Sequence, residues 1–436
     1  MNPAPVRVPG DKSIAHRALI LAALADGRCE LANLPASEDL ASTRRVLAAL
    51  GTRFAASGES RVSVSGPTGW RHPAGPLDCG NSGTTARLVV GLLTGLGVPA
   101  TLVGDTSLSS RPMDRVVYPL QAMGGRLRYE RDRDRLPVEV EPRASGSLRV
   151  LRYRSRVASA QVKSSLLLAG LASGTEVEIH EPAVTRDHTE RLLAALGVPV
   201  EFGPLADGGA RARLAGGREP TRGRRGAIAG FELEVPGDLS SAAFLGIAAL
   251  LTGRPLRLED VGLNPTRTGW IELLKSAGAR LDTRIRSERL GEPVGTISLE
   301  PGPMRSFRLG PDEAVRCIDE IPVLAVLAAR IPGVSEIRGA AELRVKESDR
   351  LARISENLRG LGVRCEELED GLRIEGTERP LTGRVRTGGD HRIAMAFGTL
   401  GAAPGCEIEV DETEAVAVSY PGFWRDLERL GPGGGR

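Results

Sequence analysis

The chain has 436 residues, of which 41% are hydrophobic and 26% charged, with 58 Lys and Arg against 55 Asp and Glu. This is globular composition at a length that suits two large domains or three smaller ones, so intrinsic disorder is excluded as the main state. A formal charge of +3 over this length does not favour nucleic acid as the default partner, and small anions remain attractive ligands.

The cysteines and the apolar runs indicate the cellular compartment of the protein. An odd number of cysteines, five, with no C-x-x-C pair, predicts neither a disulfide framework nor a zinc site. The start of the chain lacks a signal-peptide core, and no apolar run reaches the ~18 residues of a membrane helix. We therefore expect a cytoplasmic protein with no membrane partner, whose cysteines are small buried side chains and not nucleophiles.

Lysine is rare in this chain. Only four of the 58 basic residues are lysine, namely Lys12, Lys163, Lys275 and Lys346, and the other 54 are arginine. Three of the four lie in dense polar strings, GDKS, SAQVKSS and RVKESDR. An ammonium is a compact charge whose pKa can move, which suits a reacting centre, whereas a guanidinium stays charged. These three lysines are therefore candidates for a functional site.

Six small-residue-rich apolar runs recur along the chain, and each closes on a glycine. They predict buried helices within residues 19–27, 89–97, 166–174, 245–253, 323–333 and 394–405. The closing glycines lie 70, 77, 79, 80 and 72 residues apart, which is too regular for accident and too long for a solenoid repeat. The spacing predicts six similar modules.

A second series of segments alternates with these runs and is amphipathic. It predicts surface helices that end at a glycine C-cap, within residues 44–54, 116–127, 190–200, 271–281, 354–364 and 424–431. Strand-like segments fill the spaces, at 29–34, 61–66, 137–142, 176–182, 255–261, 295–301, 372–376 and 406–411. Each module is thus expected to hold one buried helix, one surface helix and several strands.

The two halves of the chain also match in sequence. VPGDKSIAHRALILAALADG begins at Val8, and VPGDLSSAAFLGIAALLTG begins 227 residues later at Val235. We therefore expect two domains of three modules, one over residues 11–236 and the other over 1–10 and 237–436, with crossings at the two PGD segments. The Gly/Arg-rich stretch 216–226 is expected to be a surface loop, although its arginines could contact RNA.

Polar strings precede the buried helices, where unpaired N–H groups and the helix dipole create anion sites. The first contains Lys12 and Ser13, with His16 and Arg17 one turn later, and the second is DCGNSGTTAR, which includes Gly83. Each string alone is more simply a helix cap, since Ser, Thr and Asp prefer that position. Their repetition with added Lys or Arg favours a polyanionic ligand held between the domains.

Further polar strings follow along the chain. They contain Arg111, Ser159, Gln161, Lys163, Arg186, His188, Arg267, Asp319, Glu320, Lys346, Glu347, Arg350, His391 and Arg392. Asp319 directly precedes an apolar run, so an N-cap and a general base account for it equally well. KESD at 346–349 is either an exposed helix start or a reacting centre. His16, His180 and His188 lack metal-ligand spacing, which leaves acid–base work to carboxylates, lysines and His391.

Taken together, the strings resemble the 5-enolpyruvylshikimate-3-phosphate synthase family. The similar motifs are GDKSIAHRAL, GNSGTTARL, SLSSRPMDR, SAQVKS, TRDHTE, GDLSSAAF, NPTRTG, IDEIPVLAVLAA, LRVKESDRL and DHRIAMAF, in family order over residues 7–424. The resemblance implies an α/β fold of two similar domains, each of three βαβαββ modules in an inside-out barrel, with the active site in the interdomain cleft. It also implies a monomer with no metal and no organic cofactor.

The resemblance further implies transfer of the enolpyruvyl group from phosphoenolpyruvate to the 5-hydroxyl of shikimate 3-phosphate, with release of phosphate. Residues matched to shikimate 3-phosphate are Lys12, Ser13, Arg17, Ser159, Ala160, Gln161, Arg186, Asp319 and Lys346. Those matched to phosphoenolpyruvate are Lys12, Gly83, Arg111, Gln161, Arg350, His391 and Arg392. Asp319 would take the hydroxyl proton, while Glu347 and Lys12 or Lys346 would handle the proton on the methylene carbon.

The chain departs from the family pattern at two places. Val418 stands where some members have a lysine, and Ala160 where others have a second serine. The alternatives are a UDP-N-acetylglucosamine enolpyruvyl transferase, which uses a loop cysteine that this chain lacks, and an RNA 3′-phosphate cyclase, whose nucleotide-binding features are not found. An Arg-rich nucleic-acid-binding protein would depend on the arginines of residues 211–225 and lose affinity with salt.

Overall fold

The structure is a computed structural model that describes residues 4–58, 60–142, 148–217 and 228–430. Most of the predicted loop at 216–226 lies outside the described residues, as does the closing glycine of the last surface helix. Contacts divide the chain into two units, which we call the N-terminal unit (Gly10–Val235 with Arg289–Glu292) and the C-terminal unit (Met1–Pro9, Pro236–Glu288 and Pro293–Arg436).

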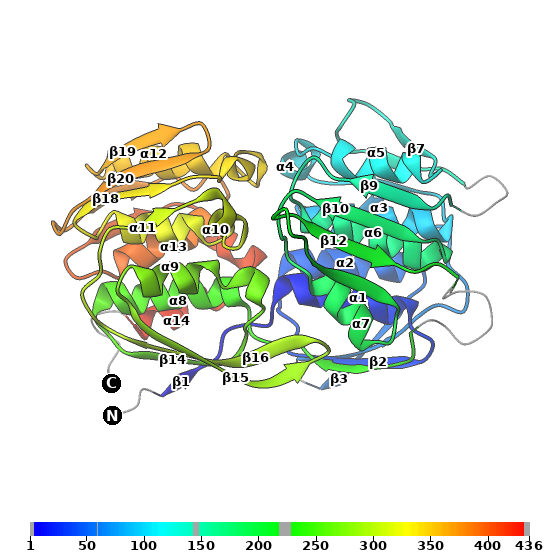
Figure 1. Cartoon of the computed structure of the whole chain (residues 1–436), viewed down its shortest axis with the longest axis horizontal. Coiled ribbons are helices and arrows are strands. Elements are labelled where there is room, and N and C mark those ends of the chain that lie inside the picture. Colours follow the sequence, from blue (N-terminus) through cyan, green and yellow to red (C-terminus); the bar gives the residue numbers. More distant parts are fainter. Residues whose placement is uncertain (1–3, 59, 143–147, 218–227, 431–436) are drawn as a thin grey trace. The chain divides into compact units, whose positions relative to one another are not determined.

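The N-terminal unit contains three four-stranded sheets, each with two or three helices (Figure 1). Its helices are α1 (Lys12–Leu24), α2 (Glu38–Ala49), α3 (Gly83–Leu96), α4 (Thr106–Ser109), α5 (Asp114–Ala122), α6 (Ala160–Ser173) and α7 (His188–Ala195). Its strands are β2 (Arg28–Ala32), β3 (Arg53–Gly58), β4 (Arg61–Ser65), β5 (Leu77–Asp78), β6 (Ala100–Val103), β7 (Leu127–Tyr129), β8 (Val138–Val140), β9 (Leu151–Arg154), β10 (Val177–Glu181), β11 (Val200–Pro204), β12 (Ala210–Leu214) and β13 (Glu232–Glu234).

The C-terminal unit contains two four-stranded sheets and one two-stranded sheet. Its helices are α8 (Leu239–Thr252), η1 (Pro265–Arg267), α9 (Gly269–Ser276), α10 (Pro311–Val315), α11 (Ile321–Ala328), η2 (Ala341–Val345), α12 (Arg350–Gly360), α13 (His391–Gly401), η3 (Thr413–Val418) and α14 (Phe423–Glu428). Its strands are β1 (Pro5–Val6), β14 (Leu256–Gly262), β15 (Arg280–Arg289), β16 (Glu292–Glu300), β17 (Arg308–Leu309), β18 (Gly333–Ile337), β19 (Arg364–Leu368), β20 (Gly371–Gly376), β21 (Thr382–Val385) and β22 (Glu407–Val410).

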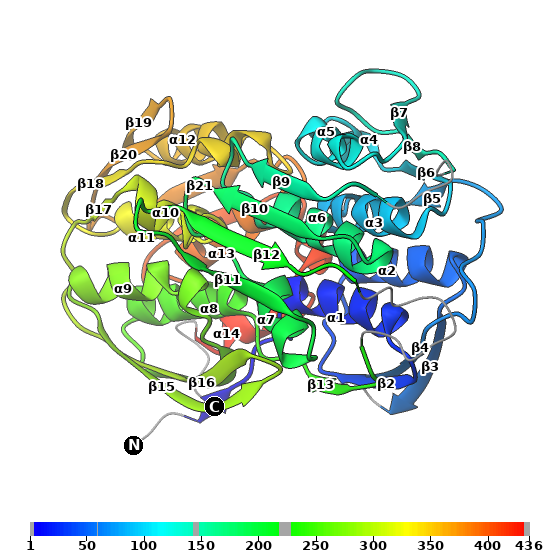
Figure 2. The same cartoon turned by 45° about the vertical axis from the view of Figure 1, so that its right-hand side comes forward.

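The four-stranded sheets share one topology. In the sheet ordered β5-β6-β8-β7, for example, the first two strands are parallel and the other neighbours antiparallel. The chain order of this module is strand, helix, strand, helices and two strands, which confirms the predicted βαβαββ arrangement. The sheet β11-β12-β10-β9 repeats it around α6 and α7, as Figure 2 shows.

The first strand of two sheets comes from a distant part of the chain. β13, at residues 232–234, pairs parallel to β2, and β1, at residues 5–6, pairs parallel to β14. The segments that follow β1 and β13 contain the two PGD motifs. The chain therefore passes between the units near Gly10 and Pro236.

The sixth module differs from the prediction. Its sheet contains only β21 and β22 in the described part of the chain, and the module ends with α14 in place of a closing hairpin.

The predicted helices and their closing glycines are confirmed. Within α1, α3, α6, α8, α11 and α13 most residues are buried, as their apolar sequences require. Eleven of the twelve predicted closing glycines are described, and all have positive φ: Gly27, Gly51, Gly97, Gly124, Gly174, Gly197, Gly253, Gly278, Gly333, Gly362 and Gly405. A residue with a Cβ would be strained in this left-handed region.

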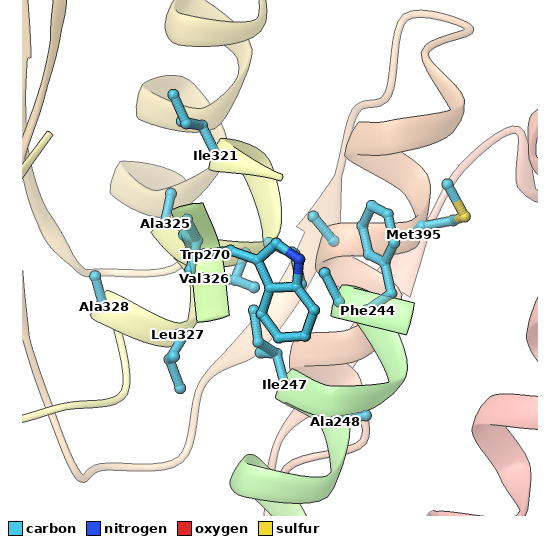
Figure 3. Packing of buried hydrophobic residues seen from close by; sticks show 14 of the residues in the cluster. Phe244, Ile247, Ala248, Trp270, Ile321, Ala325, Val326, Leu327, Ala328 and Met395 are labelled. Carbon is cyan, nitrogen blue, oxygen red and sulfur yellow. The ribbon is translucent and has the colours of Figure 1, made fainter. Parts of the chain in front are cut away.

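The core of the C-terminal unit is formed by its buried helices, which lie between the β14–β15–β16 and β18–β19–β20 sheets (Figure 1). Trp270 of α9 is fully buried, and Figure 3 shows its indole between Phe244 and Ile247 of α8 on one side and Ala325 and Val326 of α11 on the other. The N-terminal unit has a separate core. Each unit therefore has its own hydrophobic core to hold the starts of its buried helices.

Candidate active site

In the N-terminal unit, the predicted residues gather at the starts of buried helices. Lys12 is the first residue of α1, and Asp11 caps that helix by accepting from the amide of Ile14. The Lys12 ammonium donates to Asp39 of α2 at 2.7 Å, and both side chains are mostly buried. The prediction that this string is a helix cap is therefore confirmed for Asp11. Lys12, the next residue, is held at the helix start by the Asp39 carboxylate.

Arg17 lies one turn further along α1 and is almost fully buried. Its guanidinium donates to Thr189 Oγ1 at 2.7 Å, to Ser164 Oγ at 2.8 Å and to the carbonyl oxygen of Ser13 at 2.9 Å. Burial lowers the pKa of Arg17 to about 10, against the opposing effect of the Glu190 carboxylate. The side chain thus stays cationic near neutral pH, and its three named acceptors are neutral oxygens.

Gly83 begins α3, which Ser82 caps. A Cβ added at Gly83 would lie 2.7 Å from Nη1 of Arg87 and 3.5 Å from Nη1 of Arg111, so glycine lets two guanidinium groups approach the helix start. Arg87 donates from Nη1 to Gln161 Oε1 at 2.9 Å, and Gln161 donates to Thr84 Oγ1 at 3.1 Å. These contacts join the starts of α3 and α6 in one cationic cluster.

Arg111 is buried just before α5. Its guanidinium donates to Asn81 Oδ1 at 2.5 Å, to the Asn81 carbonyl oxygen at 3.2 Å and to Ser107 Oγ at 3.0 Å. The bonds fix the group beside Gly83, where a bidentate contact with a carboxylate or phosphate is geometrically natural for arginine.

The remaining predicted residues of this unit are partly exposed. Ser159 is the N-cap residue of α6 but makes no side-chain cap bond, and Ala160 follows it. Arg186 lies in the β10–α7 connection and is half-buried, as is Ser13. We call the set Lys12, Ser13, Arg17, Gly83, Arg87, Arg111, Ser159, Ala160, Gln161 and Arg186 the N-terminal anion cluster.

In the C-terminal unit, Asp319 lies among cations. Its carboxylate is 3.6 Å from Arg350 Nη1, 3.7 Å from Arg392 Nη2 and 3.8 Å from Lys346 Nζ. Arg392 also donates to the carbonyl oxygen of Asp319 at 2.7 Å. Helix α11 begins at Ile321 with Glu320 as its N-cap residue, so Asp319 lies one position before the N-cap of this helix.

Arg350 is the most deeply held cation of this group. It is almost fully buried as the first residue of α12, and it donates to Asp390 at 2.8 and 3.2 Å and to Glu347 at 2.6 Å. Burial alone would lower the pKa of Arg350, but the carboxylates of Asp390, Glu347 and Asp319 outweigh it and raise the pKa. Charge also outweighs burial at Asp390, but the pKa shifts in the other direction. Burial raises the pKa of Asp390, and the Arg350 guanidinium brings that pKa below its usual range.

The KESD string leads directly into a helix, as the first alternative predicts, whereas a reacting centre at this string stays a prediction. Asp349 caps α12 by accepting from the amide of Ala352, whereas Lys346 and Glu347 precede the helix and are half-buried. His391 and Arg392 begin α13 and are buried, with Asp390 as the cap. We call Asp319, Lys346, Glu347, Arg350, Asp390, His391 and Arg392 the C-terminal carboxylate cluster.

The sequence interpretation missed three charged residues that contact residues matched to the substrates. Asp39 pairs with Lys12, Arg87 with Gln161, and Asp390 with Arg350. Arg87 and Asp390 lie inside strings that the sequence singles out, so they could have been found there. Asp39 is 27 residues from Lys12, and its only local signal is an acidic first turn of a helix.

The structure bears on other sequence expectations as well. Within the described ranges, no group of three or more His, Cys, Asp or Glu side chains could hold a metal ion. Four of the five cysteines are buried, and burial raises the pKa of Cys79 and of Cys317, as expected for inert thiols. No described helix has the length and the apolar character to cross a membrane.

The arginines that could have indicated nucleic-acid binding are engaged where they are described. Arg211 donates to Glu178 and Arg213 to Glu176, both at 3.1 Å, across the strands of one sheet. The rest of that group falls in residues 218–227, outside the described residues. Val418, where some family members have a lysine, ends η3 and is half-buried, so this position supplies no ammonium group.

Comparisons with known proteins give one consistent result. The family model for EPSP synthase (3-phosphoshikimate 1-carboxyvinyltransferase) matches residues 3–427. A 3-phosphoshikimate 1-carboxyvinyltransferase of Thermus thermophilus is 46% identical over 98% of this chain and 96% of its own length, and one of Thermotoga neapolitana is 44% identical over 97% and 96%.

Solved structures agree with this result. An EPSP synthase from Acinetobacter baumannii matches with a TM-score of 0.83 and 36% identity, over 98% of this chain and 95% of the other. The enolpyruvyl transferase NikO from Streptomyces tendae, at 19% identity and a TM-score of 0.74 over 98% and 95%, shares the fold. These matches favour the main interpretation over a UDP-N-acetylglucosamine enolpyruvyl transferase or a nucleic-acid-binding protein. The chain therefore belongs to the EPSP synthase family of transferases.

Proposed function

We propose that this protein transfers the 1-carboxyvinyl group of phosphoenolpyruvate to the 5-hydroxyl of shikimate 3-phosphate and releases phosphate. The family match over residues 3–427 and the relatives' names support the acceptor and the transferred group. The observation that carries the chemistry is the Asp319 carboxylate, which lies within 3.8 Å of three cations in a cluster that also holds Glu347.

The reaction needs three proton transfers: one from the 5-hydroxyl group, one to C3 and one from C3. In the first step the 5-hydroxyl oxygen bonds to C2 of phosphoenolpyruvate, Asp319 takes the hydroxyl proton, and C3 gains a proton to become a methyl group. In the second step the C2–O bond to phosphate breaks, and the methyl group loses a proton to restore the double bond. We assign the proton at C3 to Glu347 together with Lys12 or Lys346, because carboxylates and lysines are the acid–base groups among the residues matched to the site.

The cations are assigned to the two anionic substrates. Shikimate 3-phosphate would contact Lys12, Ser13, Arg17, Ser159, Ala160, Gln161, Arg186, Asp319 and Lys346. Phosphoenolpyruvate would contact Lys12, Gly83, Arg111, Gln161, Arg350, His391 and Arg392. The geometry supports these roles because Gly83 leaves room beside two guanidinium groups, and because hydrogen bonds to Thr189 and Ser107 hold the guanidinium groups of Arg17 and Arg111 in fixed positions.

The two clusters differ in charge, which suggests that they have different roles in the reaction. The N-terminal anion cluster combines five basic side chains with glycine and neutral donors, which suits anion binding. The C-terminal carboxylate cluster matches Lys346, Arg350 and Arg392 with Asp319, Glu347 and Asp390, which suits proton transfer beside a phosphate leaving group. We propose that the two units are the two domains of the enzyme and that both clusters serve one reaction.

By the same family resemblance, we propose a cytoplasmic monomer that needs neither a metal ion nor an organic cofactor. Five thiols with no disulfide among them suit a reducing compartment. Activity should therefore survive exhaustive dialysis against EDTA, and the activity should elute from gel filtration at the position of one 46.1 kDa chain. Loss of activity that a divalent metal restores would contradict this part of the proposal.

Phosphate release by the purified protein tests the proposal. Phosphoenolpyruvate is supplied with shikimate 3-phosphate, with UDP-N-acetylglucosamine, or with no acceptor. We expect release only with shikimate 3-phosphate. Release only with UDP-N-acetylglucosamine would replace the acceptor, and no release with either from protein shown to be folded would remove the proposed function.

A further inference from the structure

Lys163 has no role in the reaction proposed above, yet it has an unusual environment. It lies in the first turns of α6, and its side chain is 4% exposed. Its ammonium contacts Glu181 Oε2 at 2.6 Å and Glu190 Oε1 at 2.8 Å, and both carboxylates are almost completely buried. One buried cation thus joins the start of α6 to the end of β10 and to α7.

The three groups are held as a unit by charge. Burial by itself lowers the pKa of Lys163, but the carboxylates of Glu190 and Glu181 outweigh it and raise the pKa. Burial raises the pKa of Glu190, which Lys163 opposes. Removing the ammonium would leave two buried carboxylates with no cation between them, a strongly unfavourable arrangement.

A second set of bonds links the same elements. Ser164, next to Lys163, and Thr189, next to Glu190, are hydrogen-bonded to each other at 2.7 Å, and Arg17 donates to both. The Glu190 carboxylate raises the pKa of Arg17 against the larger effect of burial. Lys163 and Arg17 therefore balance Glu181 and Glu190, two positive charges against two negative ones.

This cluster flanks two residues assigned to the acceptor, of which Gln161 is also assigned to phosphoenolpyruvate and Arg186 to the acceptor alone. Gln161 lies two positions before Lys163 on α6, and Arg186 lies in the connection between Glu181 and Glu190. Thr185, beside Arg186, donates to both carboxylate oxygens of Glu181 at 2.8 and 2.9 Å. We call residues 181–190 the Arg186 segment. Its two ends, Glu181 and Glu190, both contact the ammonium group of Lys163 at the start of α6.

We propose that Lys163 is a positioning residue that, through Glu181 and Glu190, presets the start of α6 and the Arg186 segment for shikimate 3-phosphate. This inference rests on the proposed function. A lysine suits the position because a compact ammonium fits between two carboxylates, whereas the planar guanidinium found elsewhere in this arginine-rich chain is larger.

Steady-state kinetics of Lys163→Met test the proposal, with Lys275→Met, an exposed lysine of α9, as the matched control. We expect KM for shikimate 3-phosphate to rise by about tenfold, with a change of less than about threefold in KM for phosphoenolpyruvate, because most residues near Lys163 are assigned to the acceptor. The control should match the wild type. Unchanged KM values, or equal rises in both, would overturn the proposal.

Hydrogen exchange of the protein without substrates provides a readout that does not depend on activity. Amides of residues 160–165 and 185–190 should exchange faster in Lys163→Met, while those of α1 and α3 keep their protection. If Lys163→Met does not fold, Glu190→Gln replaces it, because Lys163 and Glu181 then remain a neutral pair, and the same two readouts apply with smaller changes. Unaltered exchange in these segments would contradict the positioning role, whereas an inactive wild type would contradict the proposed function alone.

Discussion

At the scale of single residues, Asp319 is the most important residue for the proposed reaction, because it takes the proton of the 5-hydroxyl group. Three cations lie within 3.8 Å of its carboxylate, and the Arg392 guanidinium also holds its carbonyl oxygen. These contacts orient the carboxylate beside the cations, and a general base has to be held in such a fixed position. The same contacts make its side chain a sensitive place to separate binding from chemistry.

Asp319→Asn keeps the size of the side chain and removes the base. We expect kcat to fall by roughly 10²- to 10⁴-fold, the usual range for loss of a general base. The KM for phosphoenolpyruvate should stay the same or decrease, because Lys346, Arg350 and Arg392 lose a shared counter-charge. Asp312→Asn is the control, because Asp312 is an exposed residue of α10. If the kcat of both variants stays within twofold of the wild-type value, the role of Asp319 is refuted.

His16 is a residue whose burial links stability to pH. Its Nδ1 lies 2.7 Å from Thr43 Oγ1, and burial, together with Lys12 and Arg17, holds its pKa well below 6.5. The folded state therefore keeps His16 neutral at pH values where the unfolded chain takes up a proton. The free energy of unfolding should decrease as the pH falls below about 6.5, by up to ~1.4 kcal/mol per pH unit from this group.

His16→Gln should remove that contribution. Between pH 7 and pH 5.5 the variant should lose less stability than the wild type in urea unfolding experiments, although its stability at pH 7 is lower. His72→Gln, at an exposed position, should keep the wild-type slope. If His16→Gln and the wild type lose stability in parallel, the histidine does not titrate as its burial requires.

At the scale of elements, the candidate site depends on close packing between buried helices. Helices α3 and α6 approach each other at glycines, and a Cβ at Gly91 would lie 2.1 Å from the backbone oxygen of Ser165. A backbone atom cannot move aside as a flexible side chain can. The starts of these two helices provide Gly83 and Gln161, so their spacing also sets the N-terminal anion cluster.

Gly91→Ala should therefore impair both stability and activity. We expect a loss of about 1–3 kcal/mol in the free energy of unfolding and a rise in KM for phosphoenolpyruvate, as α3 moves away from α6. Gly246→Ala in α8 is the matched control, since its Cβ would meet the Trp270 side chain at an ordinary 3.6 Å. Thermal and urea unfolding of both variants provide the comparison, and equal losses would show that α3 and α6 are not packed this closely.

At the scale of the whole molecule, the protein has two separate hydrophobic cores. Leu88 belongs to the core of the N-terminal unit and Leu324 to that of the C-terminal unit, and both are fully buried. The chain passes between the units at more than the two PGD segments, because residues 289–292 at the tip of the β15–β16 hairpin belong to the N-terminal unit. Within that unit, Glu292 Oε1 lies 2.7 Å from His188 Nδ1.

Cavity variants in the two cores should act locally. Leu88→Ala and Leu324→Ala should each destabilise their own unit by about 2–5 kcal/mol. In native-state hydrogen exchange, amide protection should fall mainly in the unit that contains the substitution. Equal loss of protection in both units for either variant would indicate that the two cores unfold as one.

The sequence alone predicts a large part of the candidate site. The polar strings before the buried helices identify Lys12, Gly83, Gln161, Arg350 and Arg392, because helix starts and their caps are local features. The partners of these residues are harder to find. Asp39 lies 27 residues from Lys12, and nothing in the local sequence distinguishes it from the many other acidic residues of the chain.

The sequence by itself determined the buried helices, their closing glycines, the strands, the repeat of modules and the family. Each of these follows from spacing along the chain, which local geometry and burial impose. Only the tertiary structure decided that β1 and β13 complete sheets far away in sequence, that the sixth module has no closing hairpin among the described residues, and that Lys163 joins Glu181 and Glu190. The physical reason is that a contact partner depends on how the modules pack, and packing brings together residues whose separation leaves no periodic signal.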